Sequence, residues 1–272
     1  MERIFENIQA ISLDAMGTTI FLKRSAQEVY GEILRELGYD AQKIMPLTRD
    51  PGLFRRYWKE AERRLPPSFL RDHVDRFAHY PDAPYAFWGL IFRVMFEDLK
   101  LPEEDIIAAV EAAYLRFSEP DLWAVEATLP ELVEFCAARK VKLLVTSNWD
   151  FRLPKILGDL GIGPLFSRMI TSALVGYEKP SEKIFHYLAT TAGCAPAKIL
   201  HVGDRVEDDV LGAERAGLRA ALYSKDGVPA GNKFPFPCVQ RLNQIPGLLR
   251  VESRKSKAGR NKEQGSRSKE QG

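Results

Sequence analysis

Apolar positions change their spacing repeatedly in the second half of the chain. Short apolar runs predict strands at residues 141–145, 168–171, 199–202 and 219–223. Helical spacing predicts intervening helices at residues 131–139, 153–160, 181–192 and 208–216. An earlier run, residues 8–13, predicts the first strand. Strands that alternate with helices of this length are typical of an α/β fold, a parallel sheet with helices on both faces.

A long helical stretch separates the first strand from this series. Between residues 25 and 117 the apolar residues follow helical periods and nothing indicates a strand, while Pro66-Pro67 and residues 80–84 break the stretch into separate helices. We therefore predict an inserted all-helical domain at residues 21–118 and a sheet domain made of residues 1–20 and 119–250.

The remaining residues, 251–272, predict a disordered basic tail. They are rich in Lys, Ser, Gly and Gln, have no apolar period and contain Lys-Glu-Gln-Gly twice. Their seven basic and three acidic residues contribute +4 to a net charge of +2, so the rest of the chain carries about −2. A body of that charge gives no reason to expect nucleic-acid binding, which needs a concentrated basic surface.

The cysteines and the apolar runs indicate the compartment. Cys136, Cys194 and Cys238 are far apart and form no C-x-x-C pair, so we expect neither a disulfide framework nor a zinc site. The first residues lack the pattern of a signal peptide, and no run approaches the ~18 apolar residues of a membrane helix. We expect a cytoplasmic protein that does not enter membranes.

Polar residues that could carry chemistry follow the predicted strands. Asp14 comes directly after the first strand, Thr146-Ser147-Asn148 follow the second, and Lys179 precedes a helix that begins near Ser181. Open α/β sheets bind ligands at the carboxyl ends of their strands. Taken singly, each of these residues could equally cap a helix, form a turn or be solvated.

A cluster of acids follows a fourth strand, in Gly203-Asp204-Arg205-Val206-Glu207-Asp208-Asp209. Carboxylates held close together at the end of a buried strand are unfavourable unless a cation compensates their charge. Ligation by oxygen atoms alone favours Mg²⁺ over zinc. The same preference favours packing and hydrogen bonding over metal ligation for His201, which lies in the apolar run before this cluster.

Together, the four segments resemble the motifs of the haloacid dehalogenase-like (HAD) superfamily of hydrolases. Asp14, Ser147, Lys179 and the segment from Asp204 to Asp209 occur in the order of those motifs, each at a strand-to-helix junction. The place of the helical insert resembles the superfamily's helical-cap subgroup. Within it, residues 147–153 and 176–185 resemble the branch called haloacid dehalogenase-like hydrolase domain-containing protein 3.

This resemblance implies a Rossmann-like core, a cap domain and a function. Asp14 would attack a phosphorus or carbon centre, and Ser147, Asn148 and Lys179 would hold the transferring group of a small phosphorylated substrate. Mg²⁺ would be bound by Asp14, the backbone carbonyl of Met16, Asp204 and Asp209. The expected activity is that of a Mg²⁺-dependent phosphatase with an aspartyl-phosphate intermediate on Asp14.

Met16 departs from the pattern of the family's phosphatases, which have a second aspartate at this position. Methionine cannot transfer a proton, and general acid catalysis typically contributes about 10²–10⁴ in rate. Three readings remain open: a phosphatase for leaving groups that need little protonation or one that borrows an acid from the cap, a dehalogenase-type enzyme, and a slow or inactive binding protein. A phosphonate-cleaving enzyme would need a cap lysine, and neither Lys23 nor Lys59 lies in a recognisable context.

Overall fold

The computed structural model describes residues 5–40, 52–78, 85–227 and 236–250. Within them lies a six-stranded sheet in the order β6-β5-β2-β7-β8-β9, in which all neighbouring strands are parallel. The strands are β2 (Ala10–Leu13), β5 (Lys142–Ser147), β6 (Arg168–Thr171), β7 (Ile199–Gly203), β8 (Arg219–Tyr223) and β9 (Cys238–Val239). The sheet confirms the predicted fold class.

Both faces of the sheet carry apolar side chains that pack against helices, and successive residues of a strand point to opposite faces. Ile11, Leu13 and Val145 belong to the core that includes residues of α7 (Leu129–Arg139) and α8 (Leu153–Asp159). The intervening Ala10 and Leu144 belong to a second core with α10 (Glu182–Ala192) and α11 (Gly212–Arg215). Because both faces of these strands are buried, their sequences are nearly continuous apolar runs.

The predicted strands and helices agree with the observed ones except near the acidic cluster. A single helix was predicted over residues 208–216, but the chain forms a wide turn at η4 (Val206–Leu211) before α11 begins. The backbone N–H of Val210 donates to the carbonyl of Arg205, five residues earlier. Such π-type turns are rare in proteins, and those that occur are often found at functional sites. The two short helices α9 (Ser172–Val175) and η2 (Gly163–Leu165) were not predicted.

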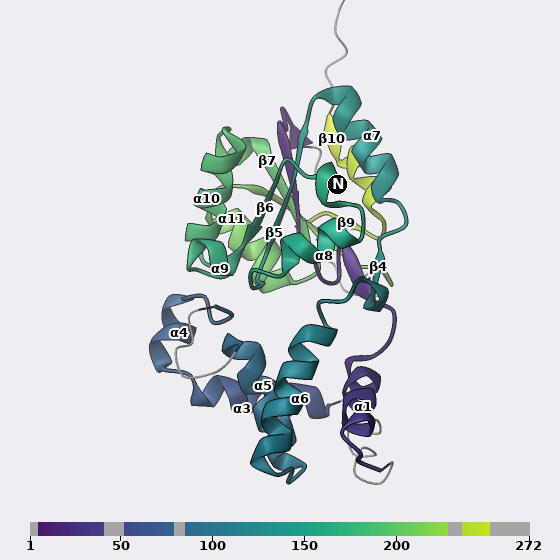
Figure 1. Cartoon of the computed structure of the whole chain (residues 1–272). Helices are drawn as coiled ribbons and strands as arrows, with labels where there is room; N and C mark the ends of the chain where they lie inside the picture. The colour runs from purple at the N-terminus through teal and green to yellow at the C-terminus, as the bar shows by residue number, and fades with distance from the viewer. Residues whose placement is uncertain (1–4, 41–51, 79–84, 228–235, 251–272) are drawn as a thin grey trace, which may run out of the picture.

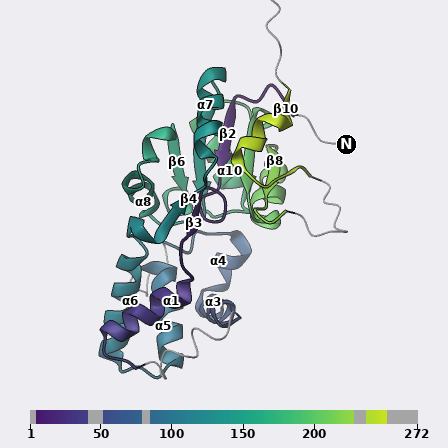
Figure 2. The same cartoon turned by 90° about the vertical axis from the view of Figure 1, so that its right-hand side faces the viewer.

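The inserted part of the chain is all-helical in the described residues between β3 (Ile20–Leu22) and β4 (Trp123–Val125). Its helices lie together below the sheet domain in Figures 1 and 2. They are α1 (Ala26–Glu36), α3 (Leu53–Arg64), α4 (Pro67–Asp72), α5 (Ala86–Asp98) and α6 (Glu103–Arg116). As the periodicity predicts, Tyr57, Ala61 and Leu65 are buried, whereas Phe54 and Trp58 are partly buried against the same core.

Among the described residues, two backbone connections join the helical part to the sheet domain. The first is the chain itself, which leaves and returns through the antiparallel pair β3 and β4. The second lies far from the first in sequence, because Val74 forms an antiparallel bridge with Tyr177 of the sheet domain. Beside this bridge, the N–H of Asp75 donates to the carbonyl of Gly176 (3.1 Å) and the N–H of Glu178 donates to the carbonyl of His73 (3.0 Å).

Near the termini of the described chain, β1 (Phe5–Glu6) pairs in parallel with β10 (Leu249–Arg250). Before β10, η5 (Leu242–Leu248) places Leu242 and Ile245 in the core beside α7. The predicted basic tail, residues 251–272, lies outside the described residues. Among the residues that are described, no helix has both the length and the apolar character needed to cross a bilayer.

Helix α10 offers a test of the second core. Leu188 is fully buried in it, whereas Tyr187, the preceding residue, is 41% exposed. We expect Leu188→Ala to lower the free energy of unfolding by about 2–5 kcal/mol, because it removes buried methyl groups and leaves a cavity. Tyr187→Ala, the matched control, should change it by less than about 1 kcal/mol. Urea denaturation followed by circular dichroism measures both, and equal losses would contradict the assignment of this face.

Candidate active site

Asp14 lies at the carboxyl end of β2, the strand between β5 and β7. Its backbone is fixed on both sides, since its N–H donates to the carbonyl of Val202 (2.9 Å) and its carbonyl accepts from the hydroxyl of Thr19 (2.6 Å). The residue is only 6% exposed. The sheet therefore holds one carboxylate, largely buried, at the position where open α/β sheets bind ligands.

Lys179 is the cation that faces this carboxylate. It lies between α9 and α10, is 3% exposed, and its Nζ donates to Asp14 Oδ1 (2.5 Å), Asp209 Oδ1 (2.5 Å) and the carbonyl of Thr146 (3.2 Å). Burial by itself would lower the pKa of Lys179, but the charges of Asp14 and Asp209 outweigh it and raise that pKa. The ammonium group is therefore charged, and all three of its N–H bonds have acceptors.

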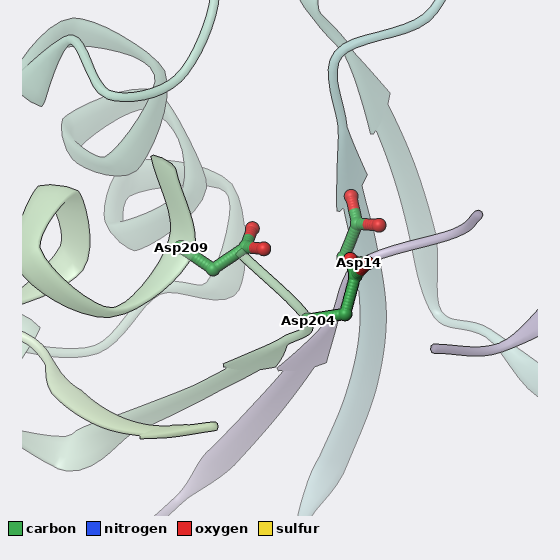
Figure 3. A group of neighbouring side chains, drawn as sticks. All are labelled: Asp14, Asp204 and Asp209. Carbon is green, nitrogen blue, oxygen red and sulfur yellow. The ribbon is translucent and has the colours of Figure 1, made fainter. Parts of the chain in front are cut away.

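Three carboxylates meet beside this lysine. Oxygen atoms of Asp14, Asp204 and Asp209 all lie within 4.8 Å of one another. Figure 3 shows these side chains coming from the end of β2, from the loop after β7 and from η4. Residues that lie 195 positions apart in the sequence thus reach one small volume, as the motif order predicts.

Two glycines make room for these carboxylates. A Cβ atom on Gly203 would lie 2.1 Å from Cγ of Asp209, and one on Gly17 would lie 2.5 Å from Oδ2 of Asp204. Gly17 also has a φ of +89°, which other residues rarely adopt. The backbone therefore forms a close cradle around the acidic group that any side chain at either position would disturb.

The surroundings shift the pKa values of the three carboxyl groups differently. Burial raises the pKa of Asp14, which Lys179 only partly offsets. Burial also acts on Asp209, but Lys179 and the hydrogen bond from His201 outweigh it and hold its pKa below the ordinary value. The pKa of Asp204 is raised to about 7 by surrounding protein atoms and by the charges of Asp14 and Asp209. An added cation would relieve this repulsion.

Ser147 and Asn148, the other predicted site residues, both lie in this site. The side chain of Ser147 is near enough to the carboxylate of Asp14 to lower the pKa of that group. The amide of Asn148 pairs with the backbone of Lys179, donating to its carbonyl (2.9 Å) and accepting from its N–H (2.6 Å). Asn148 therefore supports the lysine loop, a contact that the sequence did not predict.

Met16 lies two residues after Asp14 and is 46% exposed. It forms a parallel bridge with Ile20 in the turn that follows β2. Other large apolar side chains, such as Phe151 and Leu174, are at least as exposed, so the exposure of Met16 is not by itself unusual. The side chain at the position of the family's second aspartate is thus open to solvent and carries no ionisable group.

A charged contact from the helical part reaches the residue before Lys179. Arg76 donates to the buried carboxylate of Glu178 through Nε (2.9 Å) and Nη2 (2.5 Å), and to Glu62 of α3 through Nη1 (2.6 Å). Burial raises the pKa of Glu178, and Arg76 opposes that shift. No local pattern predicts this pair, because 102 residues separate its partners in the chain.

Comparison with known proteins places this site in a family. A family model described as haloacid dehalogenase-like hydrolase matches residues 8–217, which include every motif above. The chain belongs to the haloacid dehalogenase-like hydrolases. This confirms the resemblance drawn from the four motifs.

Relatives of this hydrolase also support the predicted branch. Haloacid dehalogenase-like hydrolase domain-containing protein 3 of Mus musculus is 30% identical over 257 residues, 90% of this chain and 96% of that protein. The Homo sapiens protein of the same name is 26% identical and is covered to 98%. Glyceraldehyde 3-phosphate phosphatase of Methanopyrus kandleri is 32% identical over 117 residues, 43% of this chain and 50% of that protein.

Solved structures with this fold include two kinds of HAD protein. A 2-haloacid dehalogenase of Pseudomonas syringae has a TM-score of 0.60 and 21% identity, over 89% of this chain and 97% of that one. A HAD phosphatase of Thermococcus onnurineus has a TM-score of 0.58 and 24% identity, over 90% and 100% of the two chains. At these identities the similarity establishes the fold, which both activities share.

The raised pKa of Asp204 predicts a pH-dependent stability in metal-free buffer. Between about pH 4 and pH 7 the folded protein holds a proton on Asp204 that the unfolded chain has lost, so stability falls as the pH rises over this range and levels off above it. We expect Asp204→Asn to raise the melting temperature relative to the parent protein more at pH 8 than at pH 5. Thermal unfolding in EDTA measures this, and a gain of equal size at both pH values would contradict it.

Proposed function

We propose that this hydrolase is a Mg²⁺-dependent phosphatase that acts on a small phosphorylated metabolite through an aspartyl-phosphate on Asp14. The observation that carries the proposal is the pairing of Asp14 with Lys179 at 2.5 Å, inside a group of three carboxylates. A charged lysine fixed on one oxygen of a carboxylate leaves the other oxygen to act as a nucleophile. It also offsets the negative charge that an incoming phosphate adds.

The reaction needs two displacements at phosphorus. In the first, a carboxylate oxygen of Asp14 forms a bond to phosphorus while the bond to the leaving oxygen breaks, and that oxygen departs with the electron pair. In the second, water attacks the phosphorus, inorganic phosphate leaves and Asp14 returns as a carboxylate. Lys179 stays beside Asp14 throughout and screens the negative charge on the transferring group.

The acidic group fits a hard divalent cation. Asp14, Asp204 and Asp209 offer only oxygen ligands, two glycines hold the backbone close to them, and the raised pKa of Asp204 reports uncompensated negative charge. We assign Mg²⁺ to these three residues and the backbone carbonyl of Met16. When bound, the ion would neutralise charge on the carboxylates and on the phosphoryl group.

Ser147 and Asn148 are assigned to the transferring group. Ser147 ends β5, the strand beside β2, and is near enough to Asp14 to lower the pKa of that carboxyl, so its hydroxyl would be near a group bound there. Asn148 uses its amide oxygen and one N–H on the backbone of Lys179, which leaves a second N–H for a phosphoryl oxygen. In the proposed site both residues therefore bind substrate, and Asn148 also holds the lysine loop.

Met16 limits the substrates that this site can turn over quickly. Without an acid at this position, a leaving oxygen that needs no proton, as in an acyl or aryl phosphate, is favoured. Relatives named glyceraldehyde 3-phosphate phosphatase and N-acylneuraminate-9-phosphatase support a phosphorylated metabolite as the substrate. We expect a small molecule, and neither nucleic acid nor a membrane, as the partner of this site.

Met16 also agrees with two alternative functions. A dehalogenase-type hydrolase releases a halide that needs no proton, which agrees with Met16, but it has less need for the acidic group around Asp204. A slow or inactive binding protein also agrees with Met16, whereas the intact pairing of Asp14 with Lys179 opposes it. Assays with an aryl phosphate and a 2-haloacid, each with and without Mg²⁺, separate the three.

The nucleophile is tested by Asp14→Asn. The amide cannot form the phosphoenzyme, so we expect hydrolysis of p-nitrophenyl phosphate to fall by about 10³-fold or more while the protein stays folded. Circular dichroism and the steady-state rate are the measurements.

A matched control for this substitution is Asp208→Asn. Asp208 lies beside Asp209 in η4, but its carboxylate accepts from the side chain of Arg205. Its substitution should leave the rate within about threefold. Turnover that survives Asp14→Asn would rule out the covalent scheme.

The missing acid is tested by Met16→Asp. If proton transfer to the leaving oxygen limits the rate, the new carboxyl should raise kcat for an alkyl phosphate by about 10²-fold or more and change it little for an aryl phosphate. Met16→Asn is the control, because it has a similar size and polarity but no transferable proton. A fall in kcat with both substrates would show that the site depends on methionine.

A further inference from the structure

Four buried polar side chains lie under the proposed active site. Ser12, Thr146 and His201 belong to the three central strands and have no solvent exposure, and Asp209 is 1% exposed. The strand alternation places Ser12, Thr146 and His201 on the face that Ala10, Leu144 and Ile199 present to the second core. Polar groups in such surroundings are costly unless each is hydrogen bonded.

These four side chains form a continuous hydrogen-bonded row. The hydroxyls of Thr146 and Ser12 are 2.9 Å apart, Ser12 Oγ is 3.1 Å from His201 Nδ1, and His201 Nε2 is 3.1 Å from Asp209 Oδ1. Ser12 and His201 are register partners in adjacent strands. The ring of Phe185 packs edge-on to the imidazole, with ring centroids 5.2 Å apart. The imidazole is therefore fixed by packing as well as by hydrogen bonds.

The row closes into a ring through Lys179. Its Nζ donates to Asp209 Oδ1 at one end of the row and to the backbone carbonyl of Thr146 at the other. The remaining oxygen of Asp209 accepts from the N–H of Arg205 (2.9 Å). The ammonium that faces Asp14 is thus one member of a closed hydrogen-bonded ring that crosses three strands.

Asp209, at one end of the row, determines which ring nitrogen of His201 carries the proton. A carboxylate only accepts, so the nitrogen that faces Asp209 must be Nε2–H. In a neutral ring Nδ1 then accepts from the hydroxyl of Ser12, and Ser12 accepts in turn from Thr146, since either hydroxyl can donate.

We propose that His201 is a positioning residue, whose Nε2–H orients the carboxylate of Asp209 and, through it, the ammonium of Lys179 against Asp14. Ser12 serves this role by occupying the opposite nitrogen of the ring. Without His201, one oxygen of Asp209 keeps only Lys179 as a donor, and the carboxylate can rotate away from it. The effect on catalysis rests on the proposed function, whereas the hydrogen-bonded ring does not.

Kinetics test the effect on catalysis. Supporting residues of this kind typically contribute about 10–100-fold to activity. We expect His201→Leu to lower kcat for p-nitrophenyl phosphate by that factor at saturating Mg²⁺ with KM within about threefold. His201→Gln, which keeps an N–H donor, should recover most of the loss. A folded His201→Leu protein with the parent kcat would overturn the proposal.

Ser12→Ala tests the ring without removing the imidazole. Ser172→Ala is its matched control, because Ser172 is also fully buried and its hydroxyl bonds to the backbone of Trp149 instead. We expect kcat to fall several-fold for Ser12→Ala and to stay near the parent value for Ser172→Ala, at similar melting temperatures. Equal effects of the two variants would assign Ser12 a purely structural role and contradict the proposal.

Imidazole ¹⁵N NMR tests the ring independently of any activity. The chain has four histidines, so the signals of His201 are identified by their absence in His201→Gln. We expect the parent protein to show a proton on Nε2 and Ser12→Ala to gain a population with the proton on Nδ1. A parent ring without a proton on Nε2 would overturn the inference. If no phosphate ester is hydrolysed, the proposed function is wrong. The spectra would then still show whether the hydrogen bonds of the ring exist.

Discussion

A buried ammonium group, Nζ of Lys179, holds the centre of this molecule together. It lies 2.5 Å from oxygens of Asp14 and Asp209, and each of the three charges would be costly to bury alone. Removing Lys179 would leave two buried carboxylates without a counterion. The arrangement is therefore constrained as a unit, and the loops that carry these residues have little freedom to move apart while the protein is folded.

The parallel sheet makes this unit possible from distant parts of the chain. Every strand of the sheet runs in the same direction, so the segments after β2, β5, β6 and β7 reach the same edge. The wide turn at η4 then directs Asp209 back toward Lys179, while Asp204 stays nearer the solvent. A fixed buried pair beside a more accessible carboxylate is the division that a site for an exchangeable cation requires.

The sequence predicted the parts of this structure that depend on local patterns. Strands at 168–171 and 219–223 are found with the predicted bounds, because their apolar runs end sharply at turn residues. The contacts of Arg76 with Glu178, and of Ser12 with His201, were not predicted, since they depend on which segments become neighbours in space. Ser12 and His201 interrupt apolar runs, and only the strand register shows that they face each other. The pairing of Asn148 with the lysine loop depends on loop geometry in the same way.

The bridge between Val74 and Tyr177 bears on whether the inserted helices of this chain could be replaced by others. An insert attached only through its two chain ends could be replaced by another without altering the sheet domain. In this chain the insert also supplies Arg76, the counterion of Glu178, whose neighbour in sequence is Lys179. An insert transplanted into this chain would therefore have to bring an equivalent cation, or it would leave a buried negative charge next to Lys179. In this chain the insert and the sheet domain are consequently matched by charge as well as by backbone contact.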